Sequence, residues 1–299
     1  MISTGKTTIT AVLLLILFFA GSVLALRKVD SVRGTEATLE DVLYIPSGKI
    51  LKRASLGYSG LLADVYWTRA VQYFGSRHLH HARRYDLLYP LLDITTDLDP
   101  QLIVAYEYGS IFLSQHPPEG AGMPDKAVAL VEKGIRENPG YWRLYFTLGF
   151  IHYQDRHDYH AAQVAFEKGS EVPGALPWMK VMAARMAEHA DDVQTAIALW
   201  NGVYETVTDQ EVKKTAISHL KSLKADVEME ELERRVQMYR DRTGAIPQNW
   251  GEMIRAGLLR GIPVDPSGAP YILASSGRVE VQNPKEFPYL GQGRSKEKN

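Results

Sequence analysis

The sequence predicts an all-α fold in which stacked helix pairs form a solenoid, with an N-terminal transmembrane helix before it and a small C-terminal helix plus β-hairpin after it. Three observations support this prediction. An uncharged apolar stretch lies near the N-terminus, prolines return at similar intervals through the middle of the chain, and proline- and glycine-rich turns follow near the C-terminus. We therefore expect an anchor over residues 1–33, an extended linker over 34–59, repeats over 60–207, capping helices over 208–242, a helix and hairpin over 243–290, and a disordered tail over 291–299.

The composition excludes several classes of protein. Of the 299 residues, 45% are hydrophobic and 23% are charged, which is typical of a folded chain. The 34 basic and 35 acidic residues nearly balance, so we expect no nucleic-acid partner. The chain has no cysteine, which rules out disulfides, thiolate metal sites and a cysteine nucleophile. No reaction motif stands out, and we expect neither an enzyme nor a cofactor.

The apolar stretch over residues 7–26 carries no charge and is followed by Arg27, Lys28 and Arg33. At about 1.5 Å per helical residue it spans roughly 30 Å, the thickness of one bilayer core. It predicts a single-pass membrane anchor with the body of the chain outside the cytoplasm. Two alternatives remain open at this point. A cleavable signal peptide would also be apolar, and the positive charges after the stretch favour a cytoplasmic body.

A regular pattern of small and aromatic residues occupies residues 140–173. Small residues are expected where two antiparallel helices cross closely, and aromatic residues fill the space on either side. The residues that carry the pattern are Tyr145, Leu148, Gly149, Ala162, Phe166, Gly169 and Pro173. The pattern resembles the tetratricopeptide repeat (TPR), a pair of antiparallel helices of about 34 residues.

The resemblance to the TPR family extends over residues 60–207. Closing prolines at positions 100, 139 and 173 lie 39 and 34 residues apart. A unit over residues 99–139 repeats the pattern with a longer turn, a weaker unit contains Ala184 and Trp200, and residues 61–98 form a degenerate capping unit. A TPR-like helical solenoid is therefore the prediction, with an unrelated helical bundle as the alternative.

The residues after the repeats change in character. Residues 210–242 are rich in charge with apolar positions every three or four residues, which predicts one or two amphipathic helices. The segment that runs from Asp265 to Tyr271 contains Pro266, Gly268 and Pro270, and it resembles the C-terminal turn and hairpin of pseudopilins. That resemblance raises calcium binding at Asp265 as an alternative to a purely structural turn, although no acidic cluster accompanies this residue.

The TPR resemblance implies a concave surface lined by the first helix of each pair. Alignment of the units on Gly109 and Gly149 selects partner-binding candidates from two neighbouring units: Tyr106, Ser110, Leu113, Arg143, Phe146, Phe150 and Tyr153. Aromatic side chains and one arginine suit the binding of a peptide or a helix. The alternative is that some of these aromatic residues only pack between the repeats.

The whole arrangement resembles bacterial membrane-anchored TPR proteins. This resemblance implies an inner-membrane scaffold with a periplasmic body that binds protein partners during assembly or stabilisation of a pilus, secretion or transport machine. The alternative is an enzyme or enzyme accessory subunit with a histidine metal site. Two groups of histidines are the candidates for that site: His78, His80, His81, His152, His157 and His160. Arginines beside the first group favour a solvated loop instead.

Overall fold

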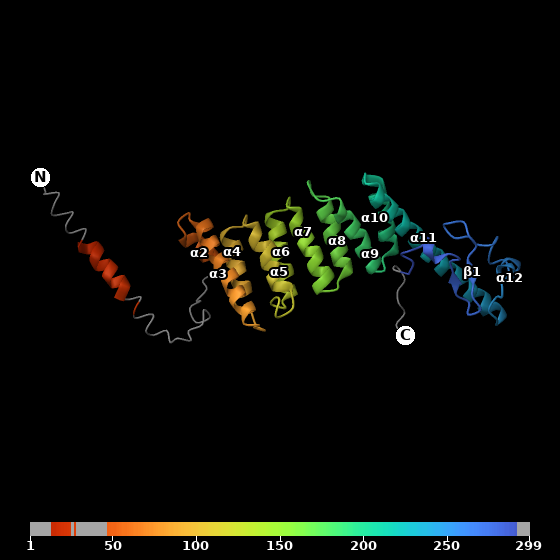
Figure 1. Ribbon diagram of the computed structural model, residues 1–299, viewed down its shortest axis with the longest axis horizontal. Coiled ribbons are helices and arrows are strands. Elements are labelled where there is room, and N and C mark those ends of the chain that lie inside the picture. The colour runs from red at the N-terminus through yellow and green to blue at the C-terminus, as the bar shows by residue number, and fades with distance from the viewer. Residues whose placement is uncertain (1–12, 25–26, 28–46, 292–299) are drawn as a thin grey trace.

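The computed structural model describes residues 13–24, 27 and 47–291, and these residues are mostly helical (Figure 1). Residues 13–24 form a helix with exposed apolar side chains. Among the described residues, no helix combines the length and the apolar character that a membrane crossing requires. The predicted anchor over residues 1–33, with its apolar stretch over 7–26, extends beyond the described residues at both ends, and it stays a prediction.

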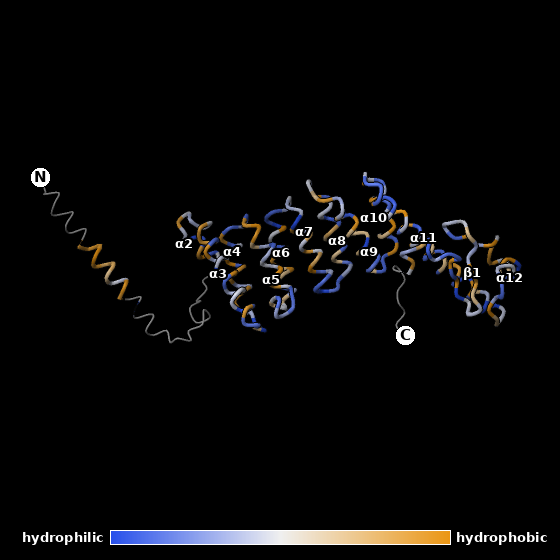
Figure 2. The backbone as a smooth tube through the Cα atoms, in the orientation of Figure 1, coloured by the Kyte–Doolittle hydropathy of each residue, from blue (hydrophilic) through white to orange (hydrophobic). Residues whose placement is uncertain are grey.

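Four helix pairs follow one another in a row. Neighbouring helices along the chain pack side by side, and each pair also contacts the next (Figure 1). The pairs are α3 (Ser59–Leu79) with α4 (Leu88–Leu98), α5 (Ile103–Ser114) with α6 (Pro124–Glu137), α7 (Trp142–Phe150) with α8 (Tyr159–Ser170), and α9 (Trp178–His189) with α10 (Val193–Thr206). Hydrophobic and hydrophilic residues alternate along these helices, as amphipathic helices in a layered core require (Figure 2). The prediction of successive helix pairs is confirmed.

Glycines mark the places where two helices approach closely. A Cβ atom added at Gly149 would lie 2.7 Å from the Phe166 ring, and one added at Gly109 would lie 2.7 Å from Leu92. Gly134 is equally confined, because a Cβ there would lie 2.8 Å from the Tyr106 ring. Only glycine leaves room for these contacts, so the predicted reason for the small residues is confirmed at Gly149.

Aspartates begin the second helix of two pairs and the long helix that follows. The Asp158 side chain accepts a hydrogen bond from the backbone N–H of Ala161 at 3.0 Å, and Asp192 accepts one from Thr195 at 3.1 Å. The hydrogen bonds from Thr195 lower the pKa of Asp192. Such N-caps each stabilise a helix by about 1 kcal/mol, and they fix where the second helix starts.

Two local features differ from the expected pattern. The helix α2 (Gly48–Ala54) lies inside the predicted extended linker, where Gly48 packs against Asp97 so closely that a Cβ would lie 2.5 Å away. The linker prediction is therefore wrong for these residues, while residues 34–46 lie outside the described part of the chain. A π-helical turn over Ile151–Asp155 extends α7 before α8 begins.

A single helix, α11 (Gln210–Thr243), follows the pairs (Figure 1). The sequence left one or two helices open, and the structure shows one. Its first half packs against α10, and its second half carries the core of the C-terminal unit. It ends at Gly244, whose φ of 74° is the left-handed conformation that closes many helices.

The C-terminal unit contains the predicted short helix and hairpin. It consists of α12 (Trp250–Arg255), strands β1 (Ile272–Leu273) and β2 (Val279–Glu280), which pair in antiparallel register, and a short 3₁₀ turn over Pro284–Glu286. Two side chains of α11 hold the hairpin. The Tyr271 hydroxyl donates to Glu228 at 2.8 Å, and the backbone N–H of Val279 donates to Glu233 at 3.0 Å.

Asp265 organises the turn before the hairpin. One carboxyl oxygen accepts hydrogen bonds from the backbone N–H groups of Ser267 at 2.8 Å and Ala269 at 3.1 Å, and from the Ser267 hydroxyl at 2.6 Å. Burial alone would raise the pKa of Asp265, but these hydrogen bonds outweigh it and lower the pKa. The turn is confirmed. No group of three histidine or acidic side chains able to hold a metal ion is found among the described residues, here or elsewhere.

A buried polar cluster joins the last helix pair to α11 and to the C-terminal segment. The Trp200 indole N–H donates to Glu188 Oε1 at 2.7 Å, and His219 Nδ1 lies 2.8 Å from the same oxygen. The His219 ring is stacked between Trp200 and Tyr289, with centroid distances of 4.0 Å and 3.5 Å. Glu188, His219 and Trp200 are all buried, so this cluster connects three helices in the interior.

Candidate functional site

Three of the predicted partner-binding residues are wholly buried. Tyr106, Ser110 and Leu113 of α5 each have 0% of their surface exposed, and they cannot contact a partner in this fold. The alignment on Gly109 selected the wrong face of the helix. Tyr106, Ser110 and Leu113 follow one another at spacings of four and three residues, so they share one face of α5. Gly109 borders that face where it packs against Leu92 of α4, and Tyr106 packs against Gly134 of α6. These three assignments are corrected.

The exposed face of α5 carries different residues. Tyr108 and Ile111 are exposed and lie three positions apart, so they are neighbours on the helix surface. Glu107 lies beside them and is half-buried. Burial raises the pKa of its carboxyl group, and nearby Arg143 acts in the opposite direction.

The predicted residues of α7 divide between the surface and the interior. Arg143 is exposed, and its guanidinium lies 5.5 Å from the centre of the Trp142 ring. The Phe146 ring contacts Trp178 of α9 edge to face at 5.1 Å and Phe150 at 4.5 Å. Phe146 is therefore the centre of an aromatic contact between neighbouring pairs that still borders the surface.

The other two predicted aromatics serve mainly the packing. Phe150 lies edge to face with the buried Phe166 at 5.5 Å, and Tyr153 contacts Phe150 at 6.3 Å and Tyr159 at 6.1 Å. Phe150 nevertheless lines a cavity, whereas Tyr153 lines none of the cavities described below. Tyr153 is half-buried, and its ring contacts are made within its own helix pair, so its role in partner binding stays a prediction.

Three adjoining cavities follow the first helices of the pairs. A central cavity of about 220 Å³ lies between α5, α7 and α9, with its lining residues being Glu107, Tyr108, Ile111, Trp142, Arg143, Phe146, Thr147 and Trp178. A second cavity of about 280 Å³ shares Ile111, Phe146 and Thr147 with it and continues to Gln154 and Asp155 of the π-helical turn. A third cavity, described in the next paragraph, adjoins the central one. We call the three cavities together the aromatic groove.

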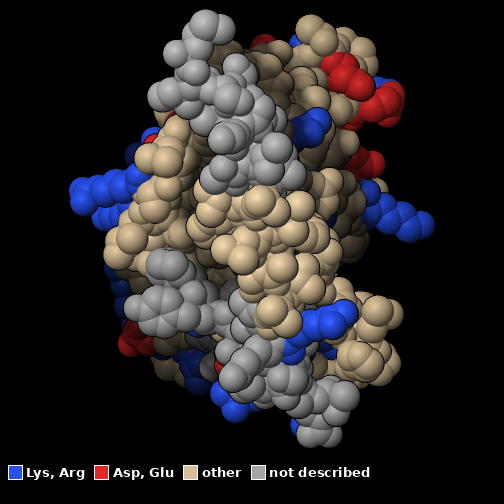
Figure 3. Space-filling view, turned by 90° about the vertical axis from the view of Figure 1, so that its left-hand side faces the viewer, with Lys and Arg blue, Asp and Glu red and all other residues tan. Residues whose placement is uncertain are grey.

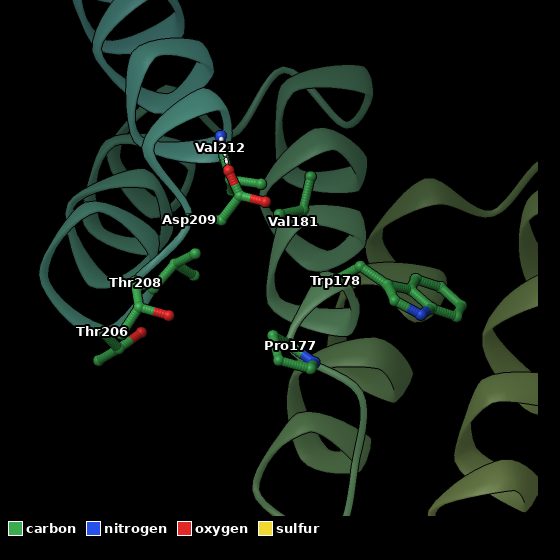
Figure 4. Close-up of a pocket in the computed structure, with 8 residues that line it drawn as sticks. Pro177, Trp178, Val181, Thr206, Thr208, Asp209 and Val212 are labelled. Atoms are coloured by element: carbon green, nitrogen blue, oxygen red, sulfur yellow. Dashed lines mark hydrogen bonds between the residues drawn. The ribbon is translucent and has the colours of Figure 1, made fainter.

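The third cavity, of about 310 Å³, lies between α9 and the α10–α11 connection and shares Trp178 with the central one (Figure 4). Its other lining residues are Pro177, Val181, Thr206, Val207, Thr208, Asp209 and Val212. The Asp209 carboxyl caps α11 by accepting from the N–H groups of Glu211 and Val212. In Figure 4 the Trp178 ring points away from the other labelled residues, which is consistent with its contact with Phe146.

The aromatic groove combines apolar and polar side chains. In its central cavity apolar and aromatic side chains dominate the lining, and Glu107 and Arg143 provide one group of each charge there. Sequence analysis missed Tyr108, Ile111 and Trp178. The sequence held no signal for the first two, because α5 is apolar on nearly all sides, and Trp178 belongs to a unit with a weaker match.

The histidine candidates do not converge. His78 Nδ1 lies 2.9 Å from the carbonyl oxygen of Pro118, and His80 and His81 are exposed at the end of α3. Burial lowers the pKa of His152 in the π-helical turn. Within residues 47–291, no three histidine or acidic side chains are arranged to bind a metal.

Comparison of the chain with family models, with curated proteins and with solved structures finds no match in any of the three.

Proposed function

We propose that the protein is a membrane-anchored, TPR-like scaffold that binds a segment of a protein partner in the aromatic groove. In this proposal it assembles or stabilises a bacterial envelope complex such as a pilus, secretion or transport machine, and it is not an enzyme. The body lies on the periplasmic side of the inner membrane, to which the N-terminal helix attaches it.

The observation that carries the proposal is the continuity of the groove across three successive first helices. Phe146 and Trp178 come from neighbouring pairs and hold each other by an edge-to-face contact, so the central aromatic rings are positioned before any partner arrives. Preorganised aromatic residues lose little conformational entropy on binding and dominate the energetics of many interfaces. An extended or helical segment with apolar side chains at regular spacing fits such a surface.

The polar groups of the groove favour an oriented partner. Arg143 is exposed and available to an acidic side chain or a backbone carbonyl, while Glu107 lies on the opposite helix of the same cavity. A segment that places a carbonyl or carboxylate at Arg143 and a donor at Glu107 would satisfy both groups. Charge pairs of this kind set orientation and specificity more than affinity.

The groove is tested with a random peptide library displayed on phage and selected against the full-length chain. We expect selected peptides to share apolar residues at regular spacing. Tyr108→Ala and Trp178→Ala should each weaken the binding of a selected peptide by roughly thirtyfold, since anchors in desolvated pockets contribute about 2 kcal/mol or more. Isothermal titration calorimetry measures the change.

The matched control is Tyr204→Ala. Tyr204 lies on α10, the second helix of its pair, with 43% of its surface exposed against 51% for Tyr108. Its replacement should leave peptide binding unchanged. Lys133 is unsuitable as a control on a second helix, because its ammonium group bridges Asp93 at 2.8 Å and Asp97 at 2.5 Å. Selected peptides that lose affinity with Tyr204→Ala but not with Trp178→Ala would contradict the proposal.

Membrane attachment is tested separately. The uncharged stretch over residues 7–26 matches a bilayer in length, so the full-length protein should sediment with membranes and resist extraction by carbonate. Mass spectrometry of the membrane fraction should find the intact N-terminus. A mature N-terminus near Leu26 in the soluble fraction would instead show a cleaved signal peptide.

A further inference from the structure

Exposed apolar and basic side chains gather where α2 meets α3. Four large apolar residues in this stretch are exposed, and two basic residues on α2 accompany them. We call these six residues the N-terminal corner: Lys49, Ile50, Arg53, Leu56, Tyr58 and Leu61. Lys49 and Arg53 lie four positions apart on α2, and Ile50 lies three before Arg53, so the three share one face of that helix.

Leu56 of the N-terminal corner combines high exposure with an unusual backbone conformation. It is 88% exposed and has a φ of 50°, in the left-handed region that a leucine seldom adopts, and Gly57 follows with a φ of 95°. The turn is held by the bond from the Tyr58 N–H to the Ser55 carbonyl at 2.9 Å. A leucine in this conformation costs conformational energy and buries little surface, so its side chain contributes little to the stability of the fold.

The helix α2 is fixed against α4 and presents basic side chains to solvent. Gly48 packs against Asp97 of α4, and Lys52 donates to the Asp97 carbonyl oxygen at 3.2 Å, which leaves Lys49 and Arg53 directed to solvent. Residues 47–63 contain three basic residues and no acidic one. Figure 3 views the molecule from the end at which α2 lies, where Lys and Arg side chains project from several sides and Asp and Glu side chains are visible as well.

We infer that the N-terminal corner rests on an anionic lipid surface, with Leu56 and Tyr58 inserted among the headgroups and Lys49 and Arg53 paired with lipid phosphates. Exposed apolar residues flanked by basic ones are the chemistry by which proteins bind the interface of anionic membranes. Only twenty residues separate Leu26, the end of the predicted anchor, from Ser47. The inference rests on the proposed membrane attachment, which keeps this end of the helix row within reach of the bilayer.

The absence of cysteine from the chain gives a direct test. The full-length Leu56→Cys variant is labelled with an environment-sensitive fluorophore and reconstituted into phosphatidylcholine vesicles with or without phosphatidylglycerol, containing a lipid-borne quencher. The control is Leu79→Cys, at the other end of α3, about 27 Å from Leu61 along the helix. Leu79 is 78% exposed and has basic neighbours, but it lies outside the corner.

We expect the label at position 56 to be quenched in vesicles with phosphatidylglycerol, and the label at position 79 to stay unquenched. The double replacement Lys49→Glu with Arg53→Glu should reduce the quenching at position 56 to the level at position 79. Equal quenching at both positions, or quenching at position 56 that ignores phosphatidylglycerol, would overturn the inference. The inference would also be overturned if a second copy of the chain, rather than lipid, shielded the label at position 56. Cross-linking would detect such a contact between two copies.

The two membrane proposals fail in different ways. If the anchor is absent, the full-length chain does not sediment with vesicles in high salt, where the electrostatic attraction of the corner is screened. If only the corner inference is wrong, the chain sediments in high salt and the label at position 56 stays unquenched at low salt as well.

Discussion

Replacing Glu188 by alanine is expected to lower the free energy of unfolding by about 3 kcal/mol or more. The change would leave the Trp200 indole N–H and the His219 ring nitrogen without their shared acceptor in the interior. Each buried polar group that loses its partner costs about 1–3 kcal/mol. Urea unfolding followed by circular dichroism measures the loss.

Two variants accompany this prediction. Glu188→Gln keeps an acceptor oxygen at the same distance from the backbone. It should therefore lower the free energy of unfolding clearly less than Glu188→Ala does. Glu205→Ala removes an exposed glutamate from the neighbouring α10, and its effect should stay within about 0.5 kcal/mol. Equal stability of Glu188→Ala and Glu205→Ala would show that the buried cluster does not stabilise the junction.

Gly149→Leu should destabilise the protein by about 1–3 kcal/mol or more through overpacking. Its Cβ alone would lie 2.7 Å from the Phe166 ring, and Phe166 is fully buried against Phe146 and Phe150, so it has no free space to move into. A fall in the urea midpoint, with an unchanged slope, is the expected result.

Gly202→Leu is the matched control for this substitution. Gly202 also lies within a helix, α10, but nothing lies within 4 Å of a Cβ built there. Because glycine costs a helix interior about 1 kcal/mol relative to better helix formers, this variant should be neutral or slightly more stable. If Gly149→Leu and Gly202→Leu had the same free energy of unfolding, this result would contradict the close crossing of α7 and α8.

The small and aromatic residues at the helix crossings were predictable from the sequence, because their spacing along the chain determines which of them face the neighbouring helix. Ala162 and Phe166 lie where the pattern around Gly149 requires a small and an aromatic residue, and both are fully buried. The helix α2 escaped prediction for the opposite reason. Its position depends on Gly48 fitting against Asp97, a contact between residues 49 positions apart that no local pattern reveals.

The candidate site was harder to predict than the fold. Of the residues that the sequence suggested for partner binding, Arg143 and Phe146 line the central cavity, and their role in binding stays a prediction. The prediction failed on α5, because an apolar helix such as Ile103–Ser114 offers no polar face by which to decide which side is inside. Tyr106 and Tyr108 look alike in the sequence, and only the packing against α6 distinguishes them.

The continuous helix α11 has a thermodynamic consequence. Ala216 and Leu223 belong to the core that α11 forms with the last helix pair, while Ala225 and Met229 belong to the core of the C-terminal unit. In a linear array, separate units normally fray from the ends one at a time, since each contacts only its neighbours. A single helix whose side chains complete two adjacent cores removes that independence. The end of the helix row and the hairpin should therefore open together, and amide hydrogen exchange should report one common opening free energy for both.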